Sequence, residues 1–221
     1  MSSLFNMDSP IMRFLSRVCD IMILNILCIV FCIPIITAGA SVTAMYTVTL
    51  KMVRGEESYI FKGFLKAFKE NFKQSTIIWL IMAAIGIFIY VDYRATAFLP
   101  GNMSTIFQIL IGALGILYFM ILVYVFPYTA RFINNIKNIF KNSLIAILNL
   151  PWTILLMLIP LGLGFLTFLT ASTLVYGSML WLLLGFASVA YVCSIILRKV
   201  FEKYEPHEEE EENELPEISE K

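Results

Sequence analysis

The sequence predicts an all-α, polytopic helical membrane protein with about six transmembrane helices in three hairpins and two amphipathic interfacial helices. Of 221 residues, 59% are hydrophobic and 14% are charged, whereas a soluble domain has about 45–50% apolar and about 25% charged residues. Four long stretches contain no Asp, Glu, Lys or Arg: 21–50, 74–91, 95–130 and 142–197. A helix needs roughly 20 apolar residues to cross about 30 Å of hydrocarbon, so the last stretch is long enough for two crossings.

The placement of Lys and Arg predicts the topology. They gather in four clusters beside the apolar stretches, at residues 13–17, 51–73, 131–141 and 198–203. Cytoplasmic loops of membrane proteins collect Lys and Arg, so the four clusters are expected on one side. An even number of crossings then separates neighbouring clusters, and both termini are cytoplasmic.

Six helices satisfy this topology. They are expected at 11–33, 37–53, 75–97, 104–127, 143–166 and 173–197, with external turns at 34–39, 92–103 and 167–176. The helix at 37–53 is short and threonine-rich, and two interpretations stay open: a tilted span in a thinned bilayer, or a half-span buried against other helices. Residues 21–40 have some features of a cleavable signal peptide. However, the segment before them is hardly basic, so we expect no cleavage.

Two segments change abruptly from lysine-rich to apolar. From Gly63 to Ser75 the sequence reads GFLKAFKENFKQS, and from Arg131 to Ser143 it reads RFINNIKNIFKNS. At about 100° per residue, the cations and the apolar side chains of each segment fall on opposite faces. We expect helices in the headgroup plane with the apolar face on lipid, a corner at each serine, and two parallel repeats at 61–127 and 131–197.

The cations of these two helices have two interpretations. In the first, they anchor loops at the membrane surface and set orientation, with anionic lipid as the ligand. In the second, they form a docking surface for a cytoplasmic protein partner. The residues concerned are Lys62, Lys66, Lys69, Lys73, Arg131, Lys137 and Lys141.

Polar residues within or near the apolar stretches are the other candidates. They are Asp20, Asn25, Gln108 and Asn149. We expect Arg17 to neutralise Asp20 from one turn away. The three amides either hydrogen-bond between helices or line a solute pathway. The helix expected at 143–166 carries two prolines and two glycines, a pattern seen both in the broken helices of transport sites and in ordinary membrane helices.

Groups for catalysis or metal binding are sparse. The single histidine, His207, lies in the acidic tail, and no glycine-rich phosphate loop occurs. The cysteines at 19, 28, 32 and 193 lack the histidines or second cysteine pair of a metal site. We therefore expect no catalytic, cofactor or metal site, no enzyme activity and no nucleic-acid partner. Residues 1–201 are expected to form the membrane domain, and residues 202–221 a disordered acidic cytoplasmic tail.

Several short motifs resemble the YesL-like family of bacterial membrane proteins. The motifs, in order, are Asn25, Pro34 with Gly39, Thr43-Ala44-Met45-Tyr46, Phe64 with FKENFKQST at 68–76, and Asn149-Leu150-Pro151. The resemblance covers residues 5–200 and implies a domain of unknown function from the cytoplasmic membrane. Because such proteins are often encoded beside genes for carbohydrate uptake and breakdown, it implies an accessory or regulatory role there, with a transporter subunit as partner. The alternative is a small transporter or channel for a small solute.

Overall fold

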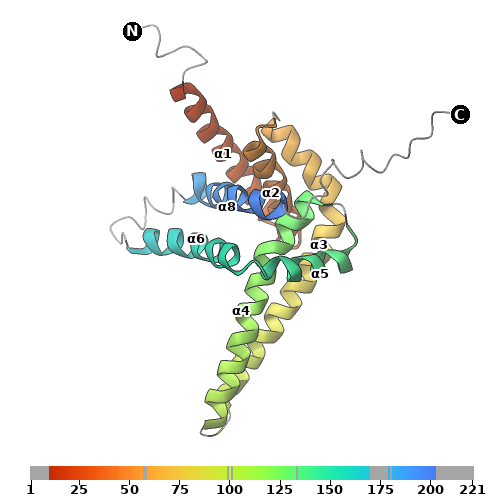
Figure 1. Cartoon of the computed structure of the whole chain (residues 1–221), viewed down its shortest axis with the longest axis vertical. Coiled ribbons are helices and arrows are strands. Elements are labelled where there is room, and N and C mark those ends of the chain that lie inside the picture. The colour runs from red at the N-terminus through yellow and green to blue at the C-terminus, as the bar shows by residue number, and fades with distance from the viewer. Residues whose placement is uncertain are drawn as a thin grey trace, which may run out of the picture.

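The computed structural model describes residues 10–56, 59–98, 100, 102–132, 134–169, 179 and 181–202, and these residues contain no β-strand. The long helices are α1 (Pro10–Cys32), α2 (Ala38–Arg54), α3 (Ile60–Ala95), α4 (Asn102–Arg131), α5 (Ile136–Ile147), α6 (Leu150–Leu169) and α8 (Phe186–Glu202) (Figure 1). Short 3-10 turns follow α1 (η1, Ile35–Thr37) and α3 (η2, Thr96–Phe98), and a π-helical turn precedes α8 (η4, Trp181–Gly185). The predicted all-α fold is confirmed.

Four described helical segments are long and apolar enough to cross a membrane. They are Ile11–Cys32, Ile60–Phe98, Asn102–Arg131 and Trp181–Phe201. A fifth crossing results if the bent pair Ile136–Ile147 and Leu150–Gly162 is one span. The chain is thus a multi-pass membrane protein, but the predicted count of six is not confirmed. The missing crossing is α2, whose 17 residues extend only about 26 Å.

Helix α2 lies inside the bundle. It packs against α1, α3, α4 and α8, and its buried residues include small ones such as Gly39, Ala40 and Ala44. Two apolar cores meet beside it, since Tyr46 contacts both. These contacts favour the interpretation of α2 as a segment buried against other helices.

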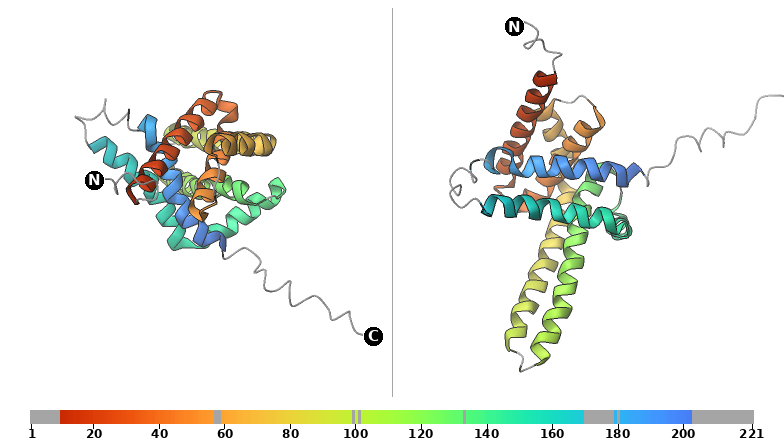
Figure 2. Two further views of the ribbon diagram at one scale, coloured as in Figure 1. Left: turned by 90° about the horizontal axis from the view of Figure 1, so that it is seen from above. Right: turned by 60° about the vertical axis from the view of Figure 1, so that its left-hand side comes forward.

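Helices α3 and α4 form a long hairpin that projects from the bundle (Figures 1 and 2). Large apolar side chains such as Ile87, Phe88, Ile109 and Leu110 are exposed along it, as expected for a surface in lipid. The predicted corner at Ser75 is wrong, because α3 is one helix of 36 residues that continues through this position. Its length of about 54 Å exceeds the hydrocarbon thickness by about 20 Å.

The predicted corner at Ser143 is also displaced. Helix α5 continues through Ser143 to Ile147, and the 98° bend to α6 comes at residues 148–149. The cause is Pro151, which has no N–H to donate to the Ile147 carbonyl. The Thr153 hydroxyl lies 3.3 Å from that carbonyl and 3.1 Å from the Asn149 carbonyl, so its one proton is shared between them. Since the first corner is absent and the second is shifted, the two predicted repeats have different backbones.

The hairpin of α6 and α8 runs across the α3–α4 hairpin (Figures 1 and 2). Helices α6 and α8 contact each other, and α8 also crosses α2 and α1. Helices α6 and α8 are therefore not parallel to α3 and α4 (Figures 1 and 2). Part of the turn expected at 167–176, and part of the helix expected at 173–197, lie outside the described residues, as does the predicted tail apart from Glu202.

Candidate functional site

The first half of α3 presents four exposed lysines and buries its opposite side. Phe64 is 0% exposed and Ala67 is 3% exposed. The Phe64 ring meets the Phe31 ring of α1 edge-on, with centroids 5.5 Å apart, and Phe68 lies 4.7 Å from the same ring. The segment is helical as predicted. Phe64 and Ala67 pack on protein, whereas Phe72 of the same apolar face is exposed. Sequence periodicity marks an apolar face without saying whether lipid or protein covers it.

The lysines of α3 remain open to solvent. Lys62, Lys66, Lys69 and Lys73 are all exposed. Lys66 Nζ lies 3.9 Å from Glu70 Oε1, but both side chains are more than half exposed, so this i,i+4 pair contributes at most about 0.5 kcal/mol. The Lys62 ammonium lies 5.4 Å from the centre of the Tyr59 ring. None of these contacts neutralises the face.

Helix α5 repeats this arrangement, and the segment just before it bonds to α3. Ile139 is buried in the main core, whereas Lys137 and Lys141 are exposed. The two helices are joined where Gln74 Nε2 of α3 donates to the Asn134 carbonyl just before α5. We call the exposed side chains of Lys62, Lys66, Lys69, Lys73, Lys137 and Lys141 the lysine face.

Arg131, the seventh predicted docking residue, does not belong to this face. It ends α4, is half-buried and already has an interaction within the protein. Its neighbour Phe132 packs edge-on against Phe201, with ring centroids 5.5 Å apart. Sequence alone grouped Arg131 with Lys137 and Lys141 because it cannot show that α4 extends to residue 131.

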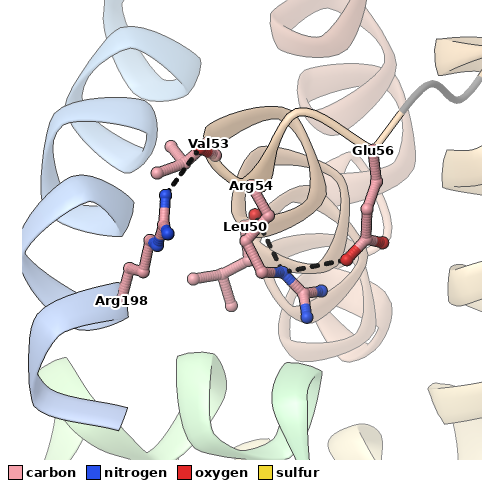
Figure 3. A network of polar contacts seen from close by, with 5 residues as sticks. All are labelled: Leu50, Val53, Arg54, Glu56 and Arg198. Atoms are coloured by element: carbon pink, nitrogen blue, oxygen red, sulfur yellow. Dashed lines mark hydrogen bonds and ion pairs between the residues drawn. The ribbon is translucent and has the colours of Figure 1, made fainter. Parts of the chain in front are cut away.

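The ends of α2 and α8 meet in a small polar network (Figure 3). Arg198 Nη1 donates to the Val53 carbonyl at 3.3 Å, and Arg54 Nε contacts the Leu50 carbonyl at 3.4 Å and Glu56 Oε1 at 3.2 Å. With the packing of Phe201 on α4, this brings the carboxyl ends of α2, α4 and α8 together. The basic residues that end these helices therefore gather in one region.

Asn25 is the most completely paired of the predicted intramembrane residues. Its side chain is 0% exposed. Its Nδ2 donates to the carbonyls of Leu182 at 2.7 Å and Trp181 at 3.3 Å, while its Oδ1 accepts from Ala187 N at 2.9 Å. One amide of α1 thus satisfies backbone groups within the π-helical turn η4 and in the first turn of α8. This is a bond between helices, one of the two interpretations of the sequence.

The other predicted polar residues lie apart from Asn25 and from each other. Gln108 Nε2 donates to Ser104 Oγ on its own helix, near the tip of the α3–α4 hairpin, at 3.4 Å. Asn149 lies at the α5–α6 bend, where its carbonyl accepts from Thr153 Oγ1 at 3.1 Å. Asp20 and Arg17 are half-buried on α1. These residues do not converge on one site.

Two buried hydroxyl pairs between helices escaped prediction. Thr49 of α2 and Ser194 of α8 share a hydrogen bond of 2.8 Å, and Tyr124 of α4 and Thr153 of α6 share one of 2.9 Å. A hydroxyl in an apolar helix is the sequence signal for such pairs, but it does not identify the partner. Within the described part of the chain, no three His, Cys, Asp or Glu side chains gather as metal ligands.

Comparisons with known proteins are consistent with the motifs noted in the sequence. A family described as "Protein of unknown function, DUF624" matches residues 21–93. These residues include α2 and most of α3. The protein named "Uncharacterized protein YesL" of Bacillus subtilis (strain 168) is 24% identical over 149 residues, which cover 66% of this chain and 70% of YesL. No solved structure matches the chain.

Proposed function

Because the chain is a YesL-like membrane protein, we propose that it is a non-catalytic component of the bacterial cytoplasmic membrane that docks a partner protein on its lysine face. The partner would present an acidic surface from the cytoplasm. The resemblance to the YesL-like family suggests that this partner belongs to a carbohydrate uptake or utilisation system, as an accessory or regulatory pairing.

The observation that carries the proposal is the packing behind the lysines. A helix that only anchors a loop at the membrane places its apolar face in lipid. In α3 and α5, residues such as Phe64, Ala67 and Ile139 face the protein core instead. Both helices therefore hold their lysines on a support that the protein core provides in part.

Rigid support favours recognition of a protein. Binding is weakened by the entropy lost when side chains and loops become ordered, and helices fixed by a core have already lost most of it. Charged groups around such a surface speed association and exclude partners of like charge. The lysine face therefore suits an acidic protein surface more specifically than it suits the headgroups of a fluid bilayer.

The solute-transport alternative has less support. A transport site needs polar groups that converge near the middle of the membrane. Asn25, Gln108 and Asn149 bond to separate parts of the chain, and the bend between α5 and α6 is explained by Pro151. No observation favours transport enough to make it a second candidate.

Charge reversal tests the proposal. Lys66→Glu with Lys69→Glu should lower recovery of the partner from gently solubilised membranes by at least tenfold, as measured by quantitative mass spectrometry, because each pair of like charges opposes association. Arg94→Glu, at the far end of α3, is the matched control and should leave recovery unchanged. Equal recovery with all three proteins, at equal thermal stability, would refute the docking role.

A carbohydrate link needs its own test. A strain lacking the gene should take up one or more labelled carbohydrates more slowly than its parent. The wild-type gene should restore uptake, and the Lys66→Glu, Lys69→Glu gene should not. Unchanged uptake across a broad carbohydrate panel would refute the carbohydrate part of the proposal. The docking role of the lysine face would still be decided by the charge-reversal experiment.

A further inference from the structure

Opposite charges of high density occur at two places in this chain. The lysine face carries six exposed ammonium groups on α3 and α5. After α8, the sequence continues EKYEPHEEEEENELPEISEK from Glu202, with five consecutive glutamates at 208–212. We infer that this acidic C-terminal segment binds the lysine face of its own chain and competes there with an acidic partner.

The end of α8 contacts residues that shortly precede α5 and α3 in the chain. Phe201 packs against Phe132, which is followed within a few residues by α5. One turn earlier, Arg198 bonds to Val53, near the short connection from α2 to α3 (Figure 3). The acidic segment therefore continues from a helix end whose contacts are to Phe132, shortly before α5, and to Val53, in the last turn of α2.

The segment is long enough to cover the face. Residues 203–221 reach at most about 60–70 Å when extended, at about 3.3–3.6 Å per residue. Lys62 and Lys73, the first and last lysines of α3, are separated by about 17 Å of helix. The glutamates at 208–212 reach at most about 20–36 Å from Glu202 at the same rise per residue, which exceeds the length of helix that carries the α3 lysines.

Tethering strengthens an otherwise weak contact. Exposed ion pairs contribute about 0–1 kcal/mol each, and a free acidic peptide would bind poorly. A short flexible tether supplies an effective concentration in the millimolar range. The contact is expected to weaken with salt, because the Debye length falls from about 10 Å at 0.1 M to about 3 Å at 1 M.

A consequence for regulation rests on the proposed function. An acidic partner must displace the segment before it docks, so loss of the glutamate charges should increase partner recovery. The contact itself forms without any partner. The two ideas can therefore fail separately: the segment can bind a face that docks nothing else, and a partner can dock on a face that the segment does not cover.

Spin-label distances test the contact directly. Full-length protein with its native cysteines replaced would carry labels at Asn213→Cys in the segment and Asn138→Cys on α5, in nanodiscs of neutral lipid. We expect a population of short label distances in low salt. Replacing the glutamates at 208–212 with glutamine, or raising NaCl to about 1 M, should remove it. Arg94→Gln, distant from the face, should leave it unchanged.

Two results would overturn the inference. One is a broad, long distance distribution in the wild-type protein at low salt. The other is a short-distance population that persists after the glutamates are neutralised, since the contact would then not depend on charge. The control variant excludes a general effect of altered charge on the nanodisc sample.

Discussion

Gly39 of α2 and Trp79 of α3 are in such close contact that no side chain fits between them. A Cβ added at Gly39 would lie 2.5 Å from Trp79 Cβ and 2.7 Å from the Ser75 carbonyl oxygen. Trp79 is also held by its indole Nε1, which donates to the Ile35 carbonyl of η1 at 2.8 Å. The turn between α1 and α2 is thereby fixed against the middle of α3.

Gly39→Ala should destabilise the protein by about 1–3 kcal/mol, because the added methyl group overpacks this contact. Nothing lies within 4 Å of a Cβ added at Gly112 of α4, so Gly112→Ala is the matched control. It should be neutral or slightly stabilising, since Ala favours helix by up to about 1 kcal/mol over Gly. Thermal unfolding in detergent would measure both, and equal midpoints would contradict the packing.

Asn25→Leu should destabilise by about 1–3 kcal/mol, because it leaves the Ala187 N–H and the Leu182 carbonyl buried without their partner. Gln108→Leu removes an amide that bonds only within its own helix and should have little effect. The comparison uses unfolding free energies in mixed micelles. A similar loss from both variants would mean that Asn25 does not hold η4 to α1.

The Thr49–Ser194 hydrogen bond should appear as a coupling free energy between α2 and α8. Double-mutant cycles in membrane proteins give about 0.6 kcal/mol on average for such bonds. Thr49→Val, Ser194→Ala and the double variant form the cycle. The sum of the two single-variant losses of unfolding free energy should exceed the loss in the double variant by about this amount. Strict additivity of the two substitutions would place the hydroxyls out of contact.

Gly55→Ala should weaken the end of α2. Gly55 has φ = 75°, its N–H donates to the Met52 carbonyl, and the Glu56 N–H donates to the Lys51 carbonyl. This Schellman-type end needs a left-handed residue, which costs any residue with a Cβ about 1–2 kcal/mol. A lower thermal midpoint than that of Gly112→Ala is expected. Gly55→Asn, which tolerates this conformation better, should recover part of the loss.

Features that depend on composition and local breaks were predictable from the sequence. The turn at 34–39 is confirmed between α1 and α2, and the turn at 92–103 is confirmed between α3 and α4. The first begins at Pro34 and the second contains Pro100, and proline cannot continue a helix. Gly39, expected in the first turn, lies inside α2. The exposure of six lysines follows equally simply from the cost of burying charge.

Features that depend on which helices meet were not predictable. The change from lysine to apolar residues at Ser75 predicts a bend in the chain. In the structure it marks a change in surroundings within the continuous helix α3. Asn25 was recognised as a residue that bonds between helices. Its partners, Leu182 and Ala187, are more than 150 residues away in sequence. Periodicity identifies a buried face, and only tertiary contacts identify what buries it.

The most direct test of the docking role is photo-cross-linking in living cells from within the lysine face. A photoreactive amino acid would replace Glu70, between Lys69 and Lys73, and, as control, the exposed Ile109 on the α3–α4 hairpin. A docking surface predicts a discrete protein adduct of one mass from position 70, and none of that mass from position 109. Protein adducts that are identical at both positions, or lipid adducts alone at position 70, would contradict it.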